Sequence, residues 1–181
     1  IINAPYNPVT GLGAVGERKK ILIKDSPIGD MYLPVELIKE NLFIRRLAKY
    51  GFKGYITRFI KEVEYSEEAL NQLWIEFIKY RIIYDFEYWT YSFIFIKDKV
   101  SPKDIPFKLN RAQRRVLNKL EKLRKAGKPI KFILLKARQW GGSTLVQIYM
   151  LWIMLVHRRN WNTVICGDVE TQSRNVRAMI T

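Results

Sequence analysis

The spacing of apolar residues predicts helices over much of the first two thirds of the chain. Apolar positions recur every three or four residues over 34–50, and Gly51 is expected to end that helix. A second helix is predicted over 66–84, with two acids in its first turn, and a third over 111–126. Residues 1–30 are rich in Pro and Gly and are expected to be extended or loop-like.

The pattern changes in the last third of the chain. Residues 130–135 and 162–167 are short apolar runs of the length of buried strands, and the first is followed by an apolar helix over 145–156. Strands that alternate with helices in this way form a parallel sheet with right-handed crossovers. The expected fold is therefore α/β. It has a mostly helical N-terminal region over 1–100, and residues 101–181 form the first part of a parallel-sheet domain that is truncated.

A basic, glycine-containing turn, residues 136–144, lies between the first of these strands and its helix. A helix N-terminus offers backbone N–H groups and a positive dipole end, so a strand, a tight turn and a helix together can form a phosphate-binding loop. The standard pattern is G-x-x-x-x-G-K-[ST]. Gly141 takes the second glycine position and Ser143 the magnesium-binding hydroxyl. Gly142 stands at the lysine position, and Lys136 at that of the first glycine.

The cation of this loop has thus moved from its end to its start. Lys136 has a long stem that can reach the β- and γ-phosphates, and Arg138 has a planar fork that suits phosphate oxygens. We expect the backbone N–H groups of Gly141 to Thr144 to line the phosphates and Ser143 to bind Mg²⁺. The alternative is a plain turn whose basic residues bind no ligand.

A second feature, residues 107–113, lies upstream of the loop. Asn110 followed three residues later by Gln113 is nearly a helix capping box. The segment is also similar to the Q motif that precedes the phosphate loop in helicase-like ATPases and reads adenine. In that interpretation Gln113 hydrogen-bonds to the base, and Phe107 or Leu109 packs near it. Both interpretations can hold, and the phosphate loop nearby favours the adenine role.

A displaced lysine in a loop of this kind resembles the deviant Walker A motif of the large terminase subunit of tailed bacteriophages, the ATPase that pumps viral DNA into the capsid. The aromatic run 84–96 and the Ile-Phe-Ile-Lys-Asp-Lys string at 94–99 are similar to the segment that leads into the Q motif of that family. The resemblance covers about residues 85–175. It implies an ATPase with ATP and Mg²⁺ as cofactors and with Lys136 and Arg138 in catalytic roles. The implied nucleotide contacts are Phe107, Gln113, Lys136, Gln139, Gly141, Gly142, Ser143 and Thr144, with Ser143 also on the metal.

The same resemblance implies what the whole protein works with. Large terminases package double-stranded viral DNA with the portal protein and the small terminase subunit as partners. They form a ring of five subunits at the portal vertex in the host cytoplasm, and they carry a C-terminal nuclease. Two other functions stay open on the residues alone. One is a helicase-like ATPase that remodels nucleic acid, and the other is a non-enzymatic basic module that binds nucleic acid or the capsid.

The acid that positions the attacking water in such ATPases is not found after the loop. Asp168 and Glu170 follow the second apolar run, but they read as acids of a helix N-terminus. No apolar strand that ends in an acidic pair appears later. The sequence therefore predicts an N-terminal fragment that grips nucleotide but hydrolyses ATP poorly by itself.

Charge and composition agree with a polyanionic partner. Lys and Arg number 32 against 17 Asp and Glu, a net charge of +15, and residues 108–138 hold twelve of the cations and one acid, Glu121. This run is either a solvated helix face or a contact for DNA, portal or nucleotide. The aromatic run 84–96 is expected to be core rather than a platform for bases. No membrane span is expected, because the apolar helix over 145–156 is shorter than the roughly 20 residues required.

Overall fold

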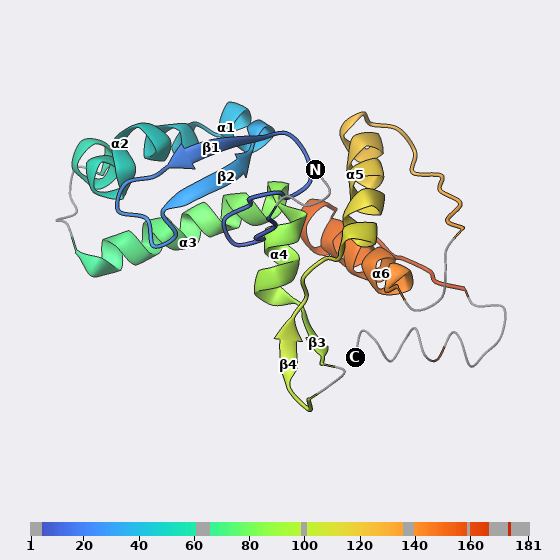
Figure 1. Cartoon of the computed structure of the whole chain (residues 1–181). Coiled ribbons are helices and arrows are strands. Elements are labelled where there is room, and N and C mark those ends of the chain that lie inside the picture. The colour runs from blue at the N-terminus through green and yellow to red at the C-terminus, as the bar shows by residue number, and fades with distance from the viewer. Residues whose placement is uncertain are drawn as a thin grey trace. The chain divides into compact units, whose positions relative to one another are not determined.

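A computed structural model describes residues 5–60, 66–98, 101–135, 140–158, 160–166 and 174 of the chain. The chain forms two compact units, residues 1–121 and 122–181 (Figure 1). This division falls later in the chain than the boundary near residue 100 that the sequence suggested. No described helix is long and apolar enough to cross a membrane.

The first unit begins with an antiparallel hairpin. Strand β1 spans Arg18–Leu22 and pairs with β2, Asp30–Pro34, with Lys20 opposite Tyr32. Apolar and polar positions alternate along the hairpin, so one face carries the buried side chains of Ile21, Met31 and Leu33. The hairpin therefore supplies one wall of a core, and helices supply the rest.

Helices α1, Val35–Glu40, and α2, Leu42–Phe59, replace the single helix expected over 34–50. The chain breaks at Asn41, whose side-chain oxygen accepts from the Ile44 amide at 3.1 Å and so starts α2. Gly51 interrupts the helix as predicted. It takes φ 73° and ψ 177°, which is not helical, and a second helical stretch follows this kink within α2. A left-handed φ is easily reached by glycine alone.

Helices α3, Glu67–Tyr84, and α4, Phe86–Phe93, complete the main body of the first unit. The Ser66 hydroxyl caps α3 by accepting from the Ala69 amide at 3.2 Å, which confirms the predicted helix start. The buried side chains of one core come from β1, β2, α1, α2 and α3 and include Ile21, Ile23, Met31, Leu33, Leu37, Ile44, Leu47, Phe52, Ile56, Ala69, Leu73 and Phe77.

The aromatic run 84–96 forms α4 and the start of a second hairpin. Phe86, Tyr88 and Trp89 are buried, as the core interpretation predicted, whereas Phe93 is 52% exposed and Phe95 58%. Strand β3, Phe95–Lys97, pairs antiparallel with β4, Asp104–Pro106. The Phe107 amide then donates to the Ile94 carbonyl at 2.8 Å and fixes the approach to the next helix.

Two helices follow. Helix α5 spans Arg111–Lys125, close to the predicted range, and runs from the first unit into the second. Helix α6 spans Gly142–Trp152 and continues as a π-helical turn, η1, over Ile153–His157. The apolar helix predicted over 145–156 is therefore present, and it begins three residues earlier.

The predicted parallel sheet is wrong. The sheets among the described residues are the two antiparallel pairs β1–β2 and β3–β4, and neither 130–135 nor 162–166 forms a strand. Ile133 is 99% exposed, Leu135 100% and Val164 78%. A central parallel strand needs hydrogen-bonded neighbours and helices over both faces. The described residues place no strand beside these runs, so their apolar side chains stay in contact with solvent.

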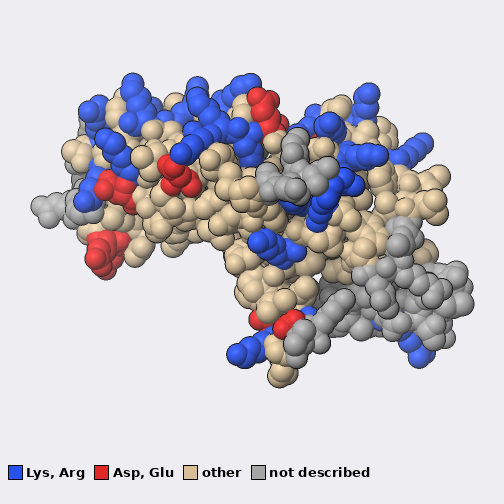
Figure 2. All heavy atoms as spheres, viewed as in Figure 1, with Lys and Arg blue, Asp and Glu red and all other residues tan. Residues whose placement is uncertain are grey.

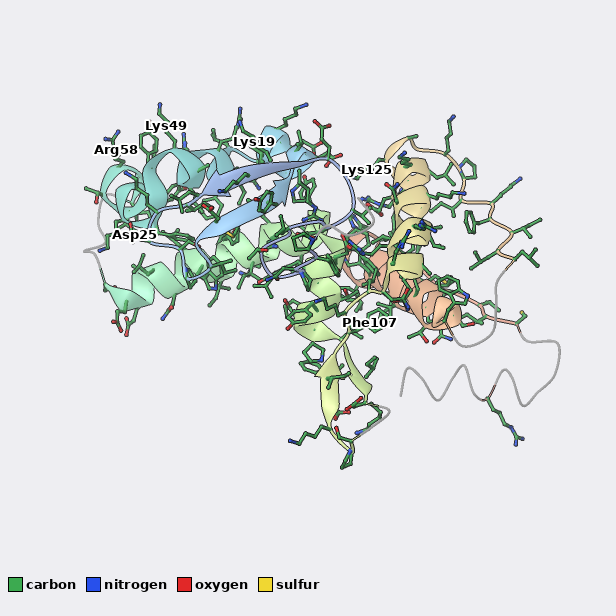
Figure 3. All side chains as sticks on the ribbon, viewed as in Figure 1. Lys19, Asp25, Lys49, Arg58, Phe107 and Lys125 are labelled. Atoms are coloured by element: carbon green, nitrogen blue, oxygen red, sulfur yellow. The ribbon has the colours of Figure 1, made fainter. Side chains whose placement is uncertain are left out.

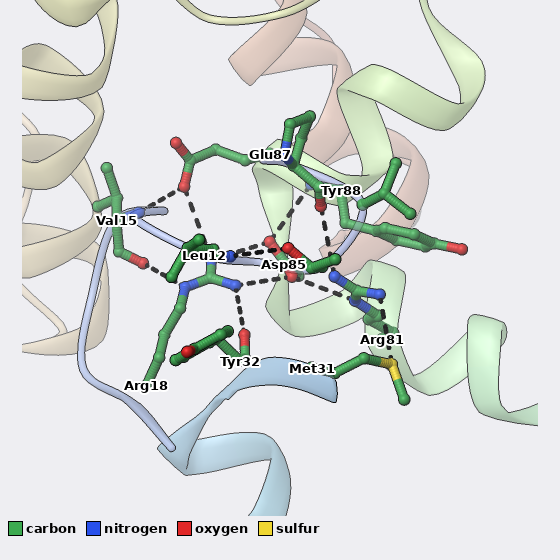
Figure 4. A network of polar contacts seen from close by, with 12 residues as sticks. Leu12, Val15, Arg18, Met31, Tyr32, Arg81, Asp85, Glu87 and Tyr88 are labelled. Carbon is green, nitrogen blue, oxygen red and sulfur yellow. Dashed lines mark hydrogen bonds and ion pairs between the residues drawn. The ribbon is translucent and has the colours of Figure 1, made fainter. Parts of the chain in front are cut away.

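A buried ion pair joins the β1–β2 hairpin to the junction of α3 and α4 (Figure 4). The two Nη atoms of Arg18 donate to the two carboxylate oxygens of Asp85, each at 2.9 Å. Arg18 also donates to the carbonyls of Val15 and Tyr32 at 3.1 Å. Burial opposes ionisation of Asp85, but the charges of Arg18 and Arg81 outweigh it and hold the pKa of this carboxyl below its ordinary value.

Arg81 and Glu87 extend this network. The guanidinium of Arg81, fully buried, donates to Asp85 at 3.3 Å and to the Pro8 carbonyl at 3.3 Å. One oxygen of Glu87 accepts from the Val15 amide at 2.5 Å and lies 3.6 Å from an Nη of Arg18. Burial nevertheless raises the pKa of Glu87 to about 7, because desolvation outweighs the nearby arginine.

The raised pKa of Glu87 predicts how stability depends on pH. The pKa rises from 4.5 to about 7 on folding, so the protonated carboxyl stabilises the fold below about pH 4.5, and this contribution is lost as pH rises through 7. Glu87→Gln keeps a neutral side chain of the same shape at every pH. As pH rises from 5 to 8, we therefore expect the free energy of unfolding of the wild type to fall by on the order of 2–3 kcal/mol relative to that of Glu87→Gln. Urea denaturation at several pH values measures this difference.

The matched control for this experiment is Glu76→Gln, which removes a carboxylate whose side chain is 41% exposed. It is expected to follow the wild-type pH dependence. Parallel curves for the wild type and Glu87→Gln would show that the buried carboxyl does not change protonation on folding.

Candidate functional site

The structure describes the second half of the predicted phosphate loop. Gly141 has φ 78° and ψ 24° and directly precedes α6. The Leu145 amide donates to the Gly141 carbonyl at 3.0 Å, the first hydrogen bond of the helix. Gly141, at the N-cap position, has no side chain with which to cap this helix end. The amides of a first helical turn have no partner within their own helix, so those of Gly142, Ser143 and Thr144 suit an anion.

The first turn of α6 combines a buried and an exposed position. Gly142 is buried, Ser143 is exposed and Thr144 is half-buried. The exposed hydroxyl of Ser143 is the position predicted to bind Mg²⁺. Lys136, Ala137, Arg138 and Gln139 lie outside the described residues, so the loop cations and Gln139 remain sequence predictions.

The body of α6 is held by apolar packing. Leu145, Ile148, Tyr149 and Trp152 are buried. The guanidinium carbon of Arg124, at the end of α5, lies 5.2 Å from the centre of the Trp152 ring. The ring of His157 packs edge-on against Trp152 at 4.4 Å, in the last helical turn where the sequence placed it. The first turn of α6 therefore stands at the end of a well-anchored helix.

The predicted adenine segment forms a reciprocal helix cap. The side-chain oxygen of Asn110 accepts from the Gln113 amide at 2.9 Å, and the side-chain oxygen of Gln113 accepts from the Asn110 amide at 2.8 Å. This is the capping box that the sequence suggested. Gln113 is 3% exposed, Phe107 4% and Leu109 2%. The cap is confirmed, and the contact with adenine stays a prediction.

The predicted site residues thus fall in two places. Phe107, Leu109 and Gln113 gather around the start of α5 in the first compact unit, and Gly141 to Thr144 belong to the second. No group of three or more His, Cys, Asp or Glu side chains that could hold a metal lies among the described residues. Asp168 and Glu170 lie outside them.

Helix α5 presents a row of cations to solvent. Its exposed basic residues recur at intervals of three or four and so lie along one side of the helix: they are Arg111, Arg115, Lys119, Lys122 and Lys125. The single acid of the helix, Glu121, is buried on the other side among Val116, Leu117 and Leu120. Both sequence interpretations of this charge run, solvated face and polyanion contact, are compatible with that arrangement.

The sequence analysis missed a second cationic surface, on α2. Arg46 and Arg58 each lie over an aromatic ring: the guanidinium carbon of Arg46 is 4.3 Å from the centre of Phe59, and that of Arg58 is 4.5 Å from the centre of Tyr50. Lys49 lies 5.1 Å from the centre of Tyr50. We call these five residues the α2 patch. Their spacing carries no motif, because the Gly51 kink brings them together.

A pocket lies elsewhere in the first unit, lined by residues that precede β2, by Phe52 and by the start of α3. The acidic side chains of Asp25 and Glu67 are among them, with Leu70, Asn71 and Trp74. Two carboxylates and no cation in the lining disfavour a polyphosphate ligand. This pocket is therefore not the nucleotide site that the sequence predicted.

No family model, curated protein or solved structure matches the chain. The function must therefore be inferred from the chain's own residues and their geometry.

The reciprocal cap predicts how α5 responds to substitution. Asn110→Ala removes the acceptor for the Gln113 amide, so we expect the free energy of unfolding to fall by about 1 kcal/mol. Asn118→Ala, in the interior of the same helix, serves as the control and is expected to change it by less than about 0.5 kcal/mol. Urea denaturation followed by circular dichroism measures both. Equal effects of the two substitutions would mean that the cap does not stabilise α5.

Proposed function

We propose that this chain binds ATP–Mg²⁺ through residues 136–144 and is part of an ATP-driven motor of the large-terminase kind, which moves double-stranded viral DNA into a capsid. The observation that carries the proposal is the left-handed Gly141 at the start of α6, one residue after a segment with the sequence Lys-Ala-Arg-Gln. Glycine in this conformation lets the chain enter the helix with the first amides directed outward.

The phosphates would be held by two kinds of donor. The amides of Gly142, Ser143 and Thr144 would approach the phosphate oxygens from the end of α6, and Ser143 Oγ would bind the magnesium ion. Lys136 would add a mobile positive charge at the β- and γ-phosphates, and Arg138 would respond to the γ-phosphate. This contact would depend on the turn and on the helix, since the described residues form no parallel sheet beside them.

The base would be read at the start of α5. Gln113 already uses its side-chain oxygen as an acceptor for the Asn110 amide. An amide oxygen has two lone pairs, so the cap leaves one acceptor for adenine, and the base would reach it once the side chain, 3% exposed, is uncovered. Phe107 would pack near the base, and Gln139 would contact the nucleotide from the loop.

The partners follow from the same proposal. They are double-stranded viral DNA, the portal protein, the small terminase subunit and further copies of the chain in a ring, at the portal vertex in the host cytoplasm. The enzyme class would be an ATPase, with Lys136 and Arg138 in catalytic roles. The net charge of +15 supports an anionic partner but does not select one.

A second candidate is a non-enzymatic module that binds nucleic acid. The row of exposed cations on α5 favours it, because such a row attracts phosphates without any nucleotide site. The two candidates differ in one respect: the module would bind DNA in a salt-dependent way and would not bind ATP–Mg²⁺.

Isothermal titration calorimetry with ATP–Mg²⁺ tests the proposal. We expect the dissociation constant to lie between micromolar and sub-millimolar and to rise at least about tenfold in Lys136→Ala, because a charge-assisted hydrogen bond is lost. Lys128→Ala removes a nearby exposed cation and is expected to change the constant by less than about twofold. Equal effects of the two substitutions, or no heat from the folded wild type, would contradict a specific phosphate contact.

A companion titration separates the two roles of Gln113. Gln113→Ala and Asn110→Ala each remove one half of the same cap. If Gln113 also reads adenine, Gln113→Ala lowers the preference for ATP over GTP, whereas Asn110→Ala leaves it unchanged. The same preference in both variants would restrict Gln113 to capping.

A further inference from the structure

The α2 patch is built across the kink at Gly51. Arg46, Lys49 and Tyr50 precede the kink, and Arg58 and Phe59 follow it. Each half contributes an arginine that covers a ring of the other half, and the two rings lie 5.7 Å apart. The two stacked pairs are therefore reciprocal, and the kink that Gly51 permits is what aligns them.

This patch is positively charged and open to solvent. Helix α2 contains no acid, and its cations are Arg45, Arg46, Lys49, Lys53 and Arg58. Lys53 lies 3.9 Å from Asp25, whereas no ion pair holds Arg46, Lys49 or Arg58 within the part of the chain that the structure describes. A hydrogen bond from Lys49 and the charges nearby lower the pKa of Tyr50, which indicates the same positive field.

The charge continues beyond α2 on the same side of the first unit. Figure 3 labels Lys19 on the hairpin and Lys49 and Arg58 on α2, and all three project to one side. The space-filling view shows Lys and Arg gathered along this face, over the hairpin and α2, with few acids between them (Figure 2). The potential of such a face attracts a polyanion over several side chains at once.

The geometry of the stacked arginines selects the part of the polyanion that is contacted. A guanidinium held flat on a ring keeps its N–H groups at its edge, where they can donate to the paired oxygens of a phosphate. An arginine covers one face of each ring, and the rings of Tyr50 and Phe59 also pack against each other, so the pair offers no bare platform of the kind on which single-stranded bases stack. A backbone contact without base stacking is the way proteins hold a duplex irrespective of its sequence.

We propose that the α2 patch contacts the phosphate backbone of double-stranded DNA. The choice of DNA as the duplex rests on the proposed function, but the contact itself requires no nucleotide. The rings of Tyr50 and Phe59 restrict the arginine side chains, so less rotational freedom is lost when the phosphates bind. Arg46 and Arg58 are the residues that bind the backbone, and Lys49 adds charge beside them.

Fluorescence anisotropy with a labelled 30-base-pair duplex, in the absence of ATP, tests this proposal. The variant is Arg46→Gln with Arg58→Gln, and the control is Lys97→Gln with Lys103→Gln, which removes the same charge from the exposed β3–β4 hairpin. We expect the α2 variant to bind roughly tenfold more weakly at moderate salt, and the slope of log K against log salt to fall by about 1.8. The control is expected to change affinity by less than about twofold.

A second variant distinguishes a lost DNA contact from a loss of folding. Arg45→Gln with Lys49→Gln changes two exposed side chains of α2, so its circular dichroism is expected to match the wild type, and its duplex affinity is expected to fall at least about threefold. Equal losses in the α2 and hairpin variants, or no binding by the wild type, would overturn the proposal. A loss of binding to phosphatidylserine vesicles as large as that to DNA would also overturn it, because the patch would then recognise anionic surfaces in general.

These measurements are independent of ATP. If the chain binds the duplex through α2 but gives no heat with ATP–Mg²⁺, the α2 contact is supported and the proposed motor function is contradicted. If the chain binds ATP–Mg²⁺ but its duplex affinity does not depend on α2, the nucleotide site is supported and the α2 contact is contradicted.

Discussion

The ion pair between Arg18 and Asp85 is the interaction on which the first unit depends. It joins residues that are 67 positions apart, and both side chains are buried. A buried charge is tolerated only when its partners are in place, and removal of one partner costs about 3–5 kcal/mol. Because Arg18 also donates to Val15 and Tyr32, the pair fixes the loop before β1, the β1–β2 hairpin and the α3–α4 junction together.

The consequences of this constraint extend along the chain. Asp85 also caps α4, by accepting from the Tyr88 amide. Helix α4 leads into the β3–β4 hairpin, and the Phe107 amide returns to Ile94 just before α5 begins. Arg114 of α5 donates to the Gly13 carbonyl at 2.7 Å and lies over the ring of Tyr6. The segment between Tyr6 and Val15 therefore touches both α4 and α5, and the capping box of α5 starts from a fixed position.

The sequence predicted the features that depend on local spacing. The amphipathic period of 111–126 and the Asn110–Gln113 box are properties of a few consecutive residues, and both are present. The split of 34–50 at Asn41 was not predicted, because it depends on tertiary packing, whereas the interruption at Gly51 was predicted from the glycine itself. The prediction of a parallel sheet was wrong for a related reason. Apolar runs such as 130–135 become strands only beside partner strands, and no described strand lies next to them.

In the candidate site, too, the local features could be predicted and the long-range ones could not. Gly141 and the start of α6 were predicted because glycine and an apolar helix are local signals. The α2 patch was not, since Arg46 and Phe59 are thirteen positions apart and meet only through the kink. The chain thus holds two chemically different arrangements that we propose bind anions. One presents backbone amides at a helix end, and the other presents arginines stacked on rings.

The central claim is that ATP is bound at a specific place rather than held by a basic surface, and photolabelling tests it most directly. The chain is irradiated with 8-azido-ATP and Mg²⁺, and the labelled peptides are identified by mass spectrometry. The account predicts that the label is concentrated in residues 107–113, where adenine is expected, and that unlabelled ATP displaces it. Label spread over the cations of α2 and α5, or label that unlabelled ATP does not displace, would contradict the claim.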